Sequence, residues 1–303
     1  MTMKDWIRCS RYCGTAALFA LLLWFPATVG AVPILFSVGG NGTTASIQST
    51  VDAFRAALGD PNNANNPGPL GSGRREINWD GGGDPNGTAA ITPFLVFQNT
   101  RGGTFTTPGS GLTQTPISGG TVDIAPLLPG LQGSLAAINP TYATTFSTFS
   151  PVRLFVPLDS NITDALFFLP GTNGSSPATV SGFGVVFTDV DLPASSHLDF
   201  FDVQGNSLGS FNVPAGTVAD GSLSFLGIVF NAGERVGRVR ITSGNTALGP
   251  NDNPLGGVDV VAMDDFLYAE PRKIAEPSTL VLLGFGMIVF AALARKRLLR
   301  KKM

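Results

Sequence analysis

The stretch Gly182-Phe-Gly-Val-Val-Phe-Thr-Asp-Val190, GFGVVFTDV, carries the clearest fold signal in the chain. Successive side chains of a β-strand point to opposite faces, so Phe183, Val185 and Phe187 share one face while valines occupy the other. A strand that is apolar on both faces is covered on both sides, as in the middle of a sandwich. The pattern therefore predicts a central strand of a β-sheet protein.

Short apolar runs bounded by Gly, Pro and Asn predict further strands before and after this stretch. Gln204-Gly205-Asn206 predicts a tight hairpin turn. Gly237 is expected to form a bulge, because Val236 can face inward together with Val239 and Ile241 only if one extra residue is inserted between them. No repeat of fixed period is present. The other predicted strands lie at 91–97, 152–156, 165–169, 197–203, 207–213 and 258–269.

The composition favours the same fold class. The 303 residues are 43% hydrophobic but only 13% charged, and they include 38 Gly and 22 Pro, which disfavour long helices. Helical spacing of apolar residues occurs in Ser46–Leu58, and a polar loop follows it at 62–73. We therefore expect an all-β protein: residues 32–74 form a short N-terminal helix and loop, and residues 75–270 form an antiparallel, jelly-roll-like β-sandwich.

The N-terminus has the three parts of a secretory signal peptide. Three basic residues among the first eleven precede an uncharged apolar stretch, 14–25, which spans about 18 Å as a helix and is short for a membrane anchor. Val29 and Ala31 then occupy the positions that signal peptidase reads. We expect residues 1–31 to be removed, leaving Val32 at the N-terminus; the alternative is a buried N-terminal helix.

The C-terminus combines an apolar stretch with positive charge. Ser278 to Ala294 is a run of 17 uncharged residues, near the lower limit for a membrane-spanning helix, and six lysine and arginine residues follow it. A buried core helix would not normally end in such a cluster, whereas a cytoplasmic basic tail is typical of a membrane span. The sequence predicts a C-terminal transmembrane helix over 278–294.

A short polar motif, Glu276-Pro277-Ser278-Thr279, stands at the start of this helix. Motif, apolar helix and basic tail, in this order, resemble the PEP-CTERM sorting signal of exported Gram-negative bacterial proteins, with Ala275 in place of the first proline of the family pattern. The resemblance, assigned to residues 271–303, implies an exosortase-type transpeptidase as partner and processing near the motif. It also implies transient inner-membrane anchoring, delivery to the cell surface or extracellular matrix, and an association with exopolysaccharide.

The body between the two terminal segments is acidic and lacks thiols. It keeps 19 of the 21 acidic and 10 of the 19 basic residues, so its net charge is −9, and nucleic acid is excluded as a partner. Cys9 and Cys13 both lie in the predicted signal peptide, so the mature protein would have no disulfide and no thiolate nucleophile. The body also resembles a secreted bacterial β module that has no assigned activity.

Few residues of the body suit catalysis or stacking on sugars. The only histidine, His197, has no nucleophile elbow near it. Glu76, Glu234 and Glu270 each stand beside arginine or proline, which predicts surface pairing. Sugar-binding faces use Trp and Tyr, and the body has only Trp79 and two tyrosines, Tyr142 and Tyr268.

Calcium is the candidate ligand, and the sequence requires no other cofactor. Asp80, Asp84 and Asn86 place oxygen ligands at intervals in a glycine-rich loop that suits a hard cation, although the spacing is not that of an EF-hand. A structural Ca²⁺ in this loop is the first hypothesis.

A second candidate calcium site combines Asp189 and Asp191 with Asp264 and Asp265. In a regular strand, one member of the pair Asp264-Asp265 must face the apolar side, where a carboxylate needs a cation, a hydrogen-bond network or a proton. The alternative is that these carboxylates accept hydrogen bonds from loop amides at the strand ends.

Three functions are compatible with these features. The first is a non-enzymatic, exosortase-sorted surface or matrix protein that acts by display or interaction. The second is a module that binds exopolysaccharide or another glycan. The third, which the sequence supports least, is a secreted carbohydrate hydrolase with a carboxylate pair.

Overall fold

The strand predicted from GFGVVFTDV is at the centre of the molecule. A computed structural model describes residues 32–81, 90–115, 122–123, 132–133, 135–150, 153–274, 283–284, 286–288 and 290. Strand β10 (Gly182–Thr188) is buried at all seven residues. It pairs antiparallel with β13 (Leu223–Val229) on one side and with β15 (Ala262–Ala269) on the other. The central position predicted for this stretch is confirmed.

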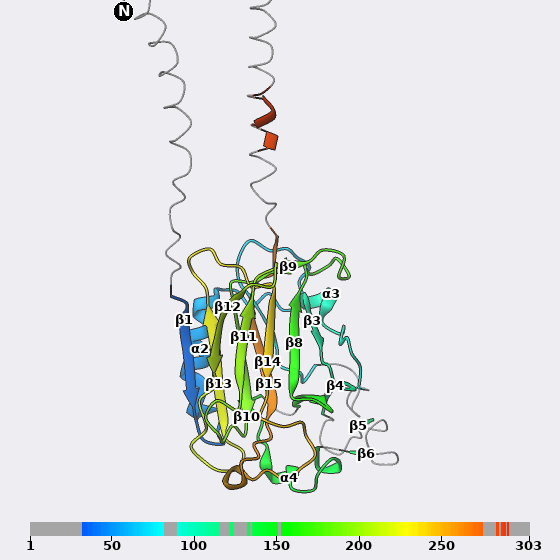
Figure 1. Cartoon of the computed structure of the whole chain (residues 1–303), viewed down its shortest axis with the longest axis vertical. Coiled ribbons are helices and arrows are strands. Elements are labelled where there is room, and N and C mark those ends of the chain that lie inside the picture. The colour runs from blue at the N-terminus through cyan, green and yellow to red at the C-terminus, as the bar shows by residue number, and fades with distance from the viewer. Residues whose placement is uncertain are drawn as a thin grey trace, which may run out of the picture. The chain divides into compact units, whose positions relative to one another are not determined.

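The described strands form two large antiparallel sheets and two small ones, so the protein is all-β (Figure 1). Sheet A has the order β1-β13-β10-β15-β7-β4, with β2 also paired to β15, and sheet B has the order β12-β11-β14-β8-β3. The remaining strands of sheet A are β1 (Ile34–Gly39), β2 (Arg74–Ile77), β4 (Gly111–Gln114) and β7 (Phe155–Leu158). Those of sheet B are β3 (Gly103–Thr106), β8 (Ile162–Phe167), β11 (His197–Phe201), β12 (Ser207–Asn212) and β14 (Arg238–Thr242). The small sheets pair β5 (Val122–Asp123) with β6 (Gln132–Gly133), and β9 (Ala178–Thr179) with β16 (Arg272–Lys273).

Aromatic side chains join the two large sheets. The ring centroid of Phe183 on β10 lies 5.9 Å from that of Phe167 on β8, and Phe266 on β15 lies 5.3 Å from Phe105 on β3. Both contacts are edge-to-face, the arrangement that aromatic pairs prefer. They belong to one continuous buried core that includes residues of both sheets.

The outer face of sheet A is covered by α2 (Ala45–Leu58), the helix predicted at 46–58. Its Phe54 packs against Phe225 of β13 with a centroid distance of 5.3 Å. A Cβ atom at either Gly184 or Gly227 would lie 2.7 Å from the Phe54 ring, so these glycines let the helix approach the sheet. Both faces of β10 are apolar because one face contacts sheet B and the other lies under α2.

The strand register places the start of β1 and the end of β15 at one end of sheet A. Ile34, the first residue of β1, is opposite Val229, which is also opposite Gly182 of β10. Phe183 is opposite Tyr268, so the last residue of β15, Ala269, lies at the same end. The loops after β10 and before β15 lie at the other end, where Figure 1 shows α4 (Tyr142–Thr145).

Most predicted strands are present with shifted ends, and the hairpin between β11 and β12 is confirmed. The prediction of a strand at 91–97 is wrong. Ile91 and Phe94 form only isolated bridges, because Pro93 between them has no N–H to donate. Gly237 precedes β14 instead of bulging within it, and Val236 pairs separately with Val180, although Val236 is buried as expected.

Residues 32–74 hold more regular structure than the predicted helix and loop. β1 was not predicted, and it is an edge strand of sheet A with exposed side chains at Ile34 and Leu35. The short helices α3 (Gln98–Arg101), η1 (Leu135–Ala137) and η2 (Pro254–Gly256) complete the described elements.

The two terminal signals lie almost entirely outside the described residues. These include the cleavage positions Val29 and Ala31, the motif Glu276-Pro277-Ser278-Thr279 and most of 278–294. Within the described ranges, no helix has both the length and the apolar character needed to cross a bilayer.

Candidate functional site

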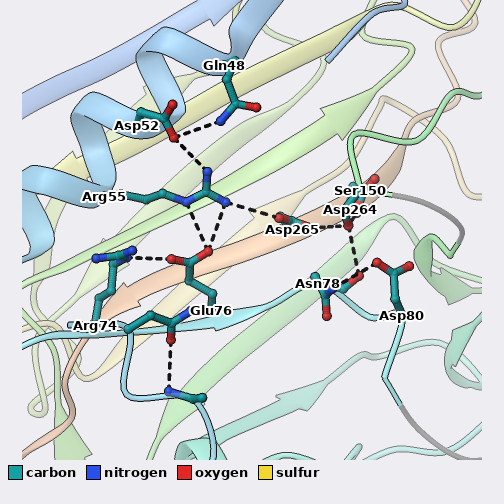
Figure 2. Close-up of polar contacts among 12 residues, drawn as sticks. Gln48, Asp52, Arg55, Arg74, Glu76, Asn78, Asp80, Ser150, Asp264 and Asp265 are labelled. Carbon is teal, nitrogen blue, oxygen red and sulfur yellow. Dashed lines mark hydrogen bonds and ion pairs between the residues drawn. The ribbon is translucent and has the colours of Figure 1, made fainter. Parts of the chain in front are cut away.

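Two groups of polar residues are candidates for a functional site. The first, here the polar pocket, is a cavity of about 450 Å³ between α2, β2 and β15. Figure 2 shows its side chains converging from these elements and from the loop at Ser150. Its lining consists of Thr44, Gln48, Arg55, Asn62, Glu76, Asn78, Arg101, Phe149, Ser150 and Asp265.

Arg55 of α2 is the central group of the polar pocket. Its Nη2 lies 3.0 Å from Glu76 Oε2 and 3.8 Å from Asp265 Oδ2, and its Nη1 lies 2.9 Å from Asp52 Oδ1. Burial alone would lower the pKa of Arg55, but Glu76 and the other carboxylates raise it above its ordinary value. Glu76 also accepts from Arg74 Nε at 2.6 Å, so two guanidinium groups hold this carboxylate.

A β-bulge brings Asp264 and Asp265 to the same side of β15. Phe187 pairs with Met263 and Val185 with Phe266, so these two aspartates are opposite a single residue of β10. The regular alternation assumed from the sequence fails here. Both carboxylates are buried, and the Ser150 hydroxyl lies 3.3 Å from Asp264 Oδ1 and 2.7 Å from Asp265 Oδ1.

Hydrogen bonds within the protein satisfy this aspartate pair. Asp264 Oδ2 accepts from the Phe149 N–H at 2.6 Å. Burial first, and then the charge of Asp265, raise the pKa of Asp264 well above its ordinary value, which favours its protonated form. Burial also raises the pKa of Asp265, against the opposing effects of Ser150 and Arg55. A proton and a hydrogen-bond network therefore meet the needs of this pair.

Asp80 is the described member of the predicted calcium loop. Its Oδ2 accepts from Asn78 Nδ2 at 3.0 Å, and its Oδ1 accepts from the Arg153 N–H at 3.0 Å. Asp84 and Asn86 lie outside the described residues. Calcium binding by this loop stays a prediction.

The second candidate, here the acidic cluster, consists of Asp189, Asp191 and Asp252. One carboxylate oxygen from each lies within 4.8 Å of the others. Thr188 pairs with Ala262, which places Asp189 beyond the start of β15 and separates it from the bulge. The structure thus keeps Asp189 and Asp191 together but does not group them with Asp264 and Asp265.

Asp252 was missed at the sequence level. It lies in the turn Pro250-Asn-Asp-Asn-Pro254, whose side-chain oxygens could have indicated a ligand loop. Nothing in the local pattern shows that this turn meets residues more than 60 positions earlier. The loop before β15 brings it there.

Burial and mutual repulsion raise the pKa values of the acidic cluster. The pKa of Asp189 rises to about 9, chiefly because the side chain is buried, and then because Asp191 and Asp252 lie nearby. The pKa of Asp191 rises to about 7 for the same reasons, burial being the largest. Burial also raises the pKa of Asp252.

The aromatic residues considered for sugar stacking are buried, and the histidine considered for catalysis lies on a strand of sheet B. His197 lies on β11 with Nε2 3.6 Å from Asp199 Oδ2, and no described serine donates to or accepts from it. Trp79 is fully buried, stacks on Phe155 at 3.7 Å and donates to the Asp264 carbonyl oxygen at 2.8 Å. Tyr142 and Tyr268 are buried as well.

The prediction that Glu270 forms a surface pair is wrong, because its side chain is buried.

No protein-family model matches the chain, and a search of curated proteins finds no significantly similar sequence.

Proposed function

We propose that the chain is an exported surface or matrix protein with a non-enzymatic interaction role. The terminal signals, read by signal peptidase and an exosortase-type transpeptidase, direct it through the inner membrane. The observation that carries the display role is the position of Ile34 and Ala269 at one end of sheet A. A chain held by the segment after Ala269 presents the opposite end, with the acidic cluster, away from its attachment.

We infer a jelly roll from the order of eight strands. We number the strands 1 to 8 along the chain, starting at β7 and leaving out the short β9. Neighbouring strands in sheet A then have the order 1-8-3-6, and those in sheet B have the order 2-7-4-5. These orders match the two Greek keys of a jelly roll, an architecture that recurs in lectin and capsid domains. The likeness supports an interaction role at the level of fold only.

Replacement of the sorting motif tests the proposed route. The variant Glu276→Ala/Pro277→Ala should stay in the inner-membrane fraction, while the wild type reaches the surface or medium. The matched control, Lys273→Ala, changes an exposed residue just before the motif and should be sorted normally. Equal surface delivery of the motif variant would contradict sorting by this signal.

The second candidate function is glycan binding at the polar pocket. Its lining offers amide, hydroxyl, guanidinium and carboxylate groups, which can hydrogen-bond the hydroxyls of a sugar. Trp79 cannot stack on a sugar because it is in the core. Pull-down with the producer's exopolysaccharide should weaken in Gln48→Ala and Asn78→Ala but not in Gln204→Ala, an exposed residue of the β11–β12 turn. Unchanged binding in the first two would reject this pocket.

A carbohydrate hydrolase is the least supported function. Arg55 pairs with both Glu76 and Asp265, so neither pocket carboxylate is free of a counter-charge. Incubation with the same polysaccharide should release no reducing ends between about pH 4 and 8. Release that is lost in Glu76→Gln would overturn the non-enzymatic proposal.

A further inference from the structure

The acidic cluster gathers negative charge where the protein supplies no counter-charge. Asp189 follows β10, Asp191 lies two residues later, and Asp252 comes from the loop before β15. Among the described residues, no lysine or arginine forms an ion pair with any of the three. Asp220 and Asp259 add further negative charge nearby. Several carboxylates brought together with little water repel one another unless a cation or protons neutralise them.

A second, independent observation points to a ligand in the cluster. Asp189 is 0% exposed, and its Oδ2 is buried without a hydrogen-bond partner. Its other oxygen, Oδ1, accepts from the Gly221 N–H at 3.0 Å, which fixes the carboxylate in place. Asp191 Oδ2 is likewise buried without a partner. Buried polar atoms in native proteins are almost always paired, so these two oxygens require a ligand.

The loops that supply the cluster are held in place by their own hydrogen bonds. Asp259 accepts from the N–H groups of Asp191 and Leu192 at 3.3 and 3.0 Å, and also from the Ser195 hydroxyl. Asp252 Oδ1 accepts from the Val260 N–H at 3.1 Å. Loop amides therefore occupy Asp259 and one oxygen of Asp189, as the alternative to a cation expected, but the Oδ2 atoms of Asp189 and Asp191 are left without a partner.

We propose that the acidic cluster is a calcium site in which Asp189, Asp191 and Asp252 are the protein ligands. Oxygen ligands of Ca²⁺ lie about 2.3–2.6 Å from the ion, so opposite ligands are about 4.6–5.2 Å apart, and oxygens within 4.8 Å of one another can contact one ion. Water completes the six to eight ligands that Ca²⁺ takes. Mg²⁺ dehydrates reluctantly and is usually held by one or two carboxylates, so it fits this cluster less well.

The site would join two loops at the end of the sandwich opposite Ile34 and Ala269. Asp189 and Asp191 belong to the segment after β10, and Asp252 belongs to the segment between β14 and β15. An ion bound to all three links these segments only in the folded state. Calcium should therefore stabilise the fold by mass action.

The test uses the full chain, purified in mild detergent and stripped of metal with EDTA. Calorimetric titration with CaCl2 should show a site that is lost in variants of the cluster, with a Kd of about 0.1–1 mM, the range of extracellular calcium modules. At about 10 mM CaCl2, Tm should rise by roughly 3–10 °C over the EDTA value. MgCl2 at the same ionic strength should give a clearly smaller rise.

Three single variants locate the site: Asp189→Asn, Asp191→Asn and Asp252→Asn. Each should lose the calcium-induced rise, and each should keep about the wild-type Tm in EDTA, because the amide is uncharged and has nearly the shape of the carboxyl that it replaces. Asp159→Asn, at an exposed aspartate outside the cluster, is the matched control and should keep the full rise.

Three results would overturn the proposal. The first is a wild type that shows neither a heat of calcium binding nor a rise in Tm with CaCl2. The others are an equal rise in Tm with MgCl2, or a calcium-induced rise in Tm that persists in all three cluster variants. The last result would place the ion elsewhere. If Asp189→Asn does not fold, Asp191→Asn and Asp252→Asn decide between the outcomes, because these side chains are only half-buried.

Discussion

The guanidinium of Arg75 and the carboxylate of Glu270 form a two-point ion pair inside the protein. Arg75 Nε lies 2.6 Å from Glu270 Oε2, and its Nη2 lies 2.8 Å from Oε1. Glu270 also accepts from Asn63 Nδ2 at 2.9 Å and from the Leu70 N–H at 3.2 Å. The pair thus fastens the loop between α2 and β2 to the end of β15.

Removing only one partner of this pair should destabilise the fold strongly. Arg75→Met leaves the Glu270 carboxylate buried without its counter-charge, and we expect a loss of about 3–5 kcal/mol in the free energy of unfolding. Urea denaturation measures this change. The double variant Arg75→Met/Glu270→Met should lose less than Arg75→Met alone, because no buried charge remains.

The control for the ion pair is Arg235→Met, at an exposed arginine, which should change stability by no more than about 0.5 kcal/mol. A loss below about 1 kcal/mol in Arg75→Met would contradict the structural role of the pair.

Close packing of α2 on sheet A gives a second prediction. In Gly227→Ala the new methyl group would lie 2.7 Å from the Phe54 ring, so the helix must move away. We expect a loss of about 1–3 kcal/mol, measured by thermal or urea denaturation. Gly71→Ala is the control, because no heavy atom lies within 4 Å of the position that its Cβ would take. Equal stability of the two variants would show that α2 does not pack closely against Gly227.

The raised pKa of Asp264 predicts a pH dependence of stability. In the unfolded chain this carboxyl loses its proton near pH 4, whereas in the folded protein it keeps it to a higher pH. The folded state then binds more protons than the unfolded state, so stability should fall as pH rises above about 4 towards the folded pKa.

Asp264→Asn isolates this contribution, since the amide imitates the protonated carboxyl: its oxygen can accept from the Phe149 N–H and its NH₂ can donate to Asp265. Denaturation in EDTA from about pH 5 to 8 should show a shallower decline in the variant than in the wild type. Gln204→Ala, at an exposed residue that carries no titratable group, is the control and should keep the wild-type slope. Identical slopes for Asp264→Asn and the wild type would mean that Asp264 is ionised in the folded state.

Patterns among neighbouring residues were enough to predict β10, α2 and the turn between β11 and β12. The alternation around Phe183, the helical spacing through Phe54 and the turn at Gly205 each describe neighbouring residues, and each element is present. The run at 91–97 failed because one proline outweighs the apolar character of its neighbours.

The candidate sites depend on contacts that no local pattern contains. Asp252 reaches Asp189 only through the arrangement of loops, and the bulge at Asp264 appears only when β15 pairs with β10. Glu270 seemed a surface residue because arginine and proline stand beside it in sequence. Its partner, however, is Arg75, 195 positions away. Spacing could identify the acidic residues, but only the arrangement of the loops and the register of the sheet group them.

Intact-mass analysis of the protein from its native host tests whether both terminal signals are read during export. We predict a surface or extracellular species that begins at Val32 and has been processed near Glu276-Pro277. A full-length chain from Met1 to Met303 in the soluble lysate, with no processed form at the surface, would contradict it.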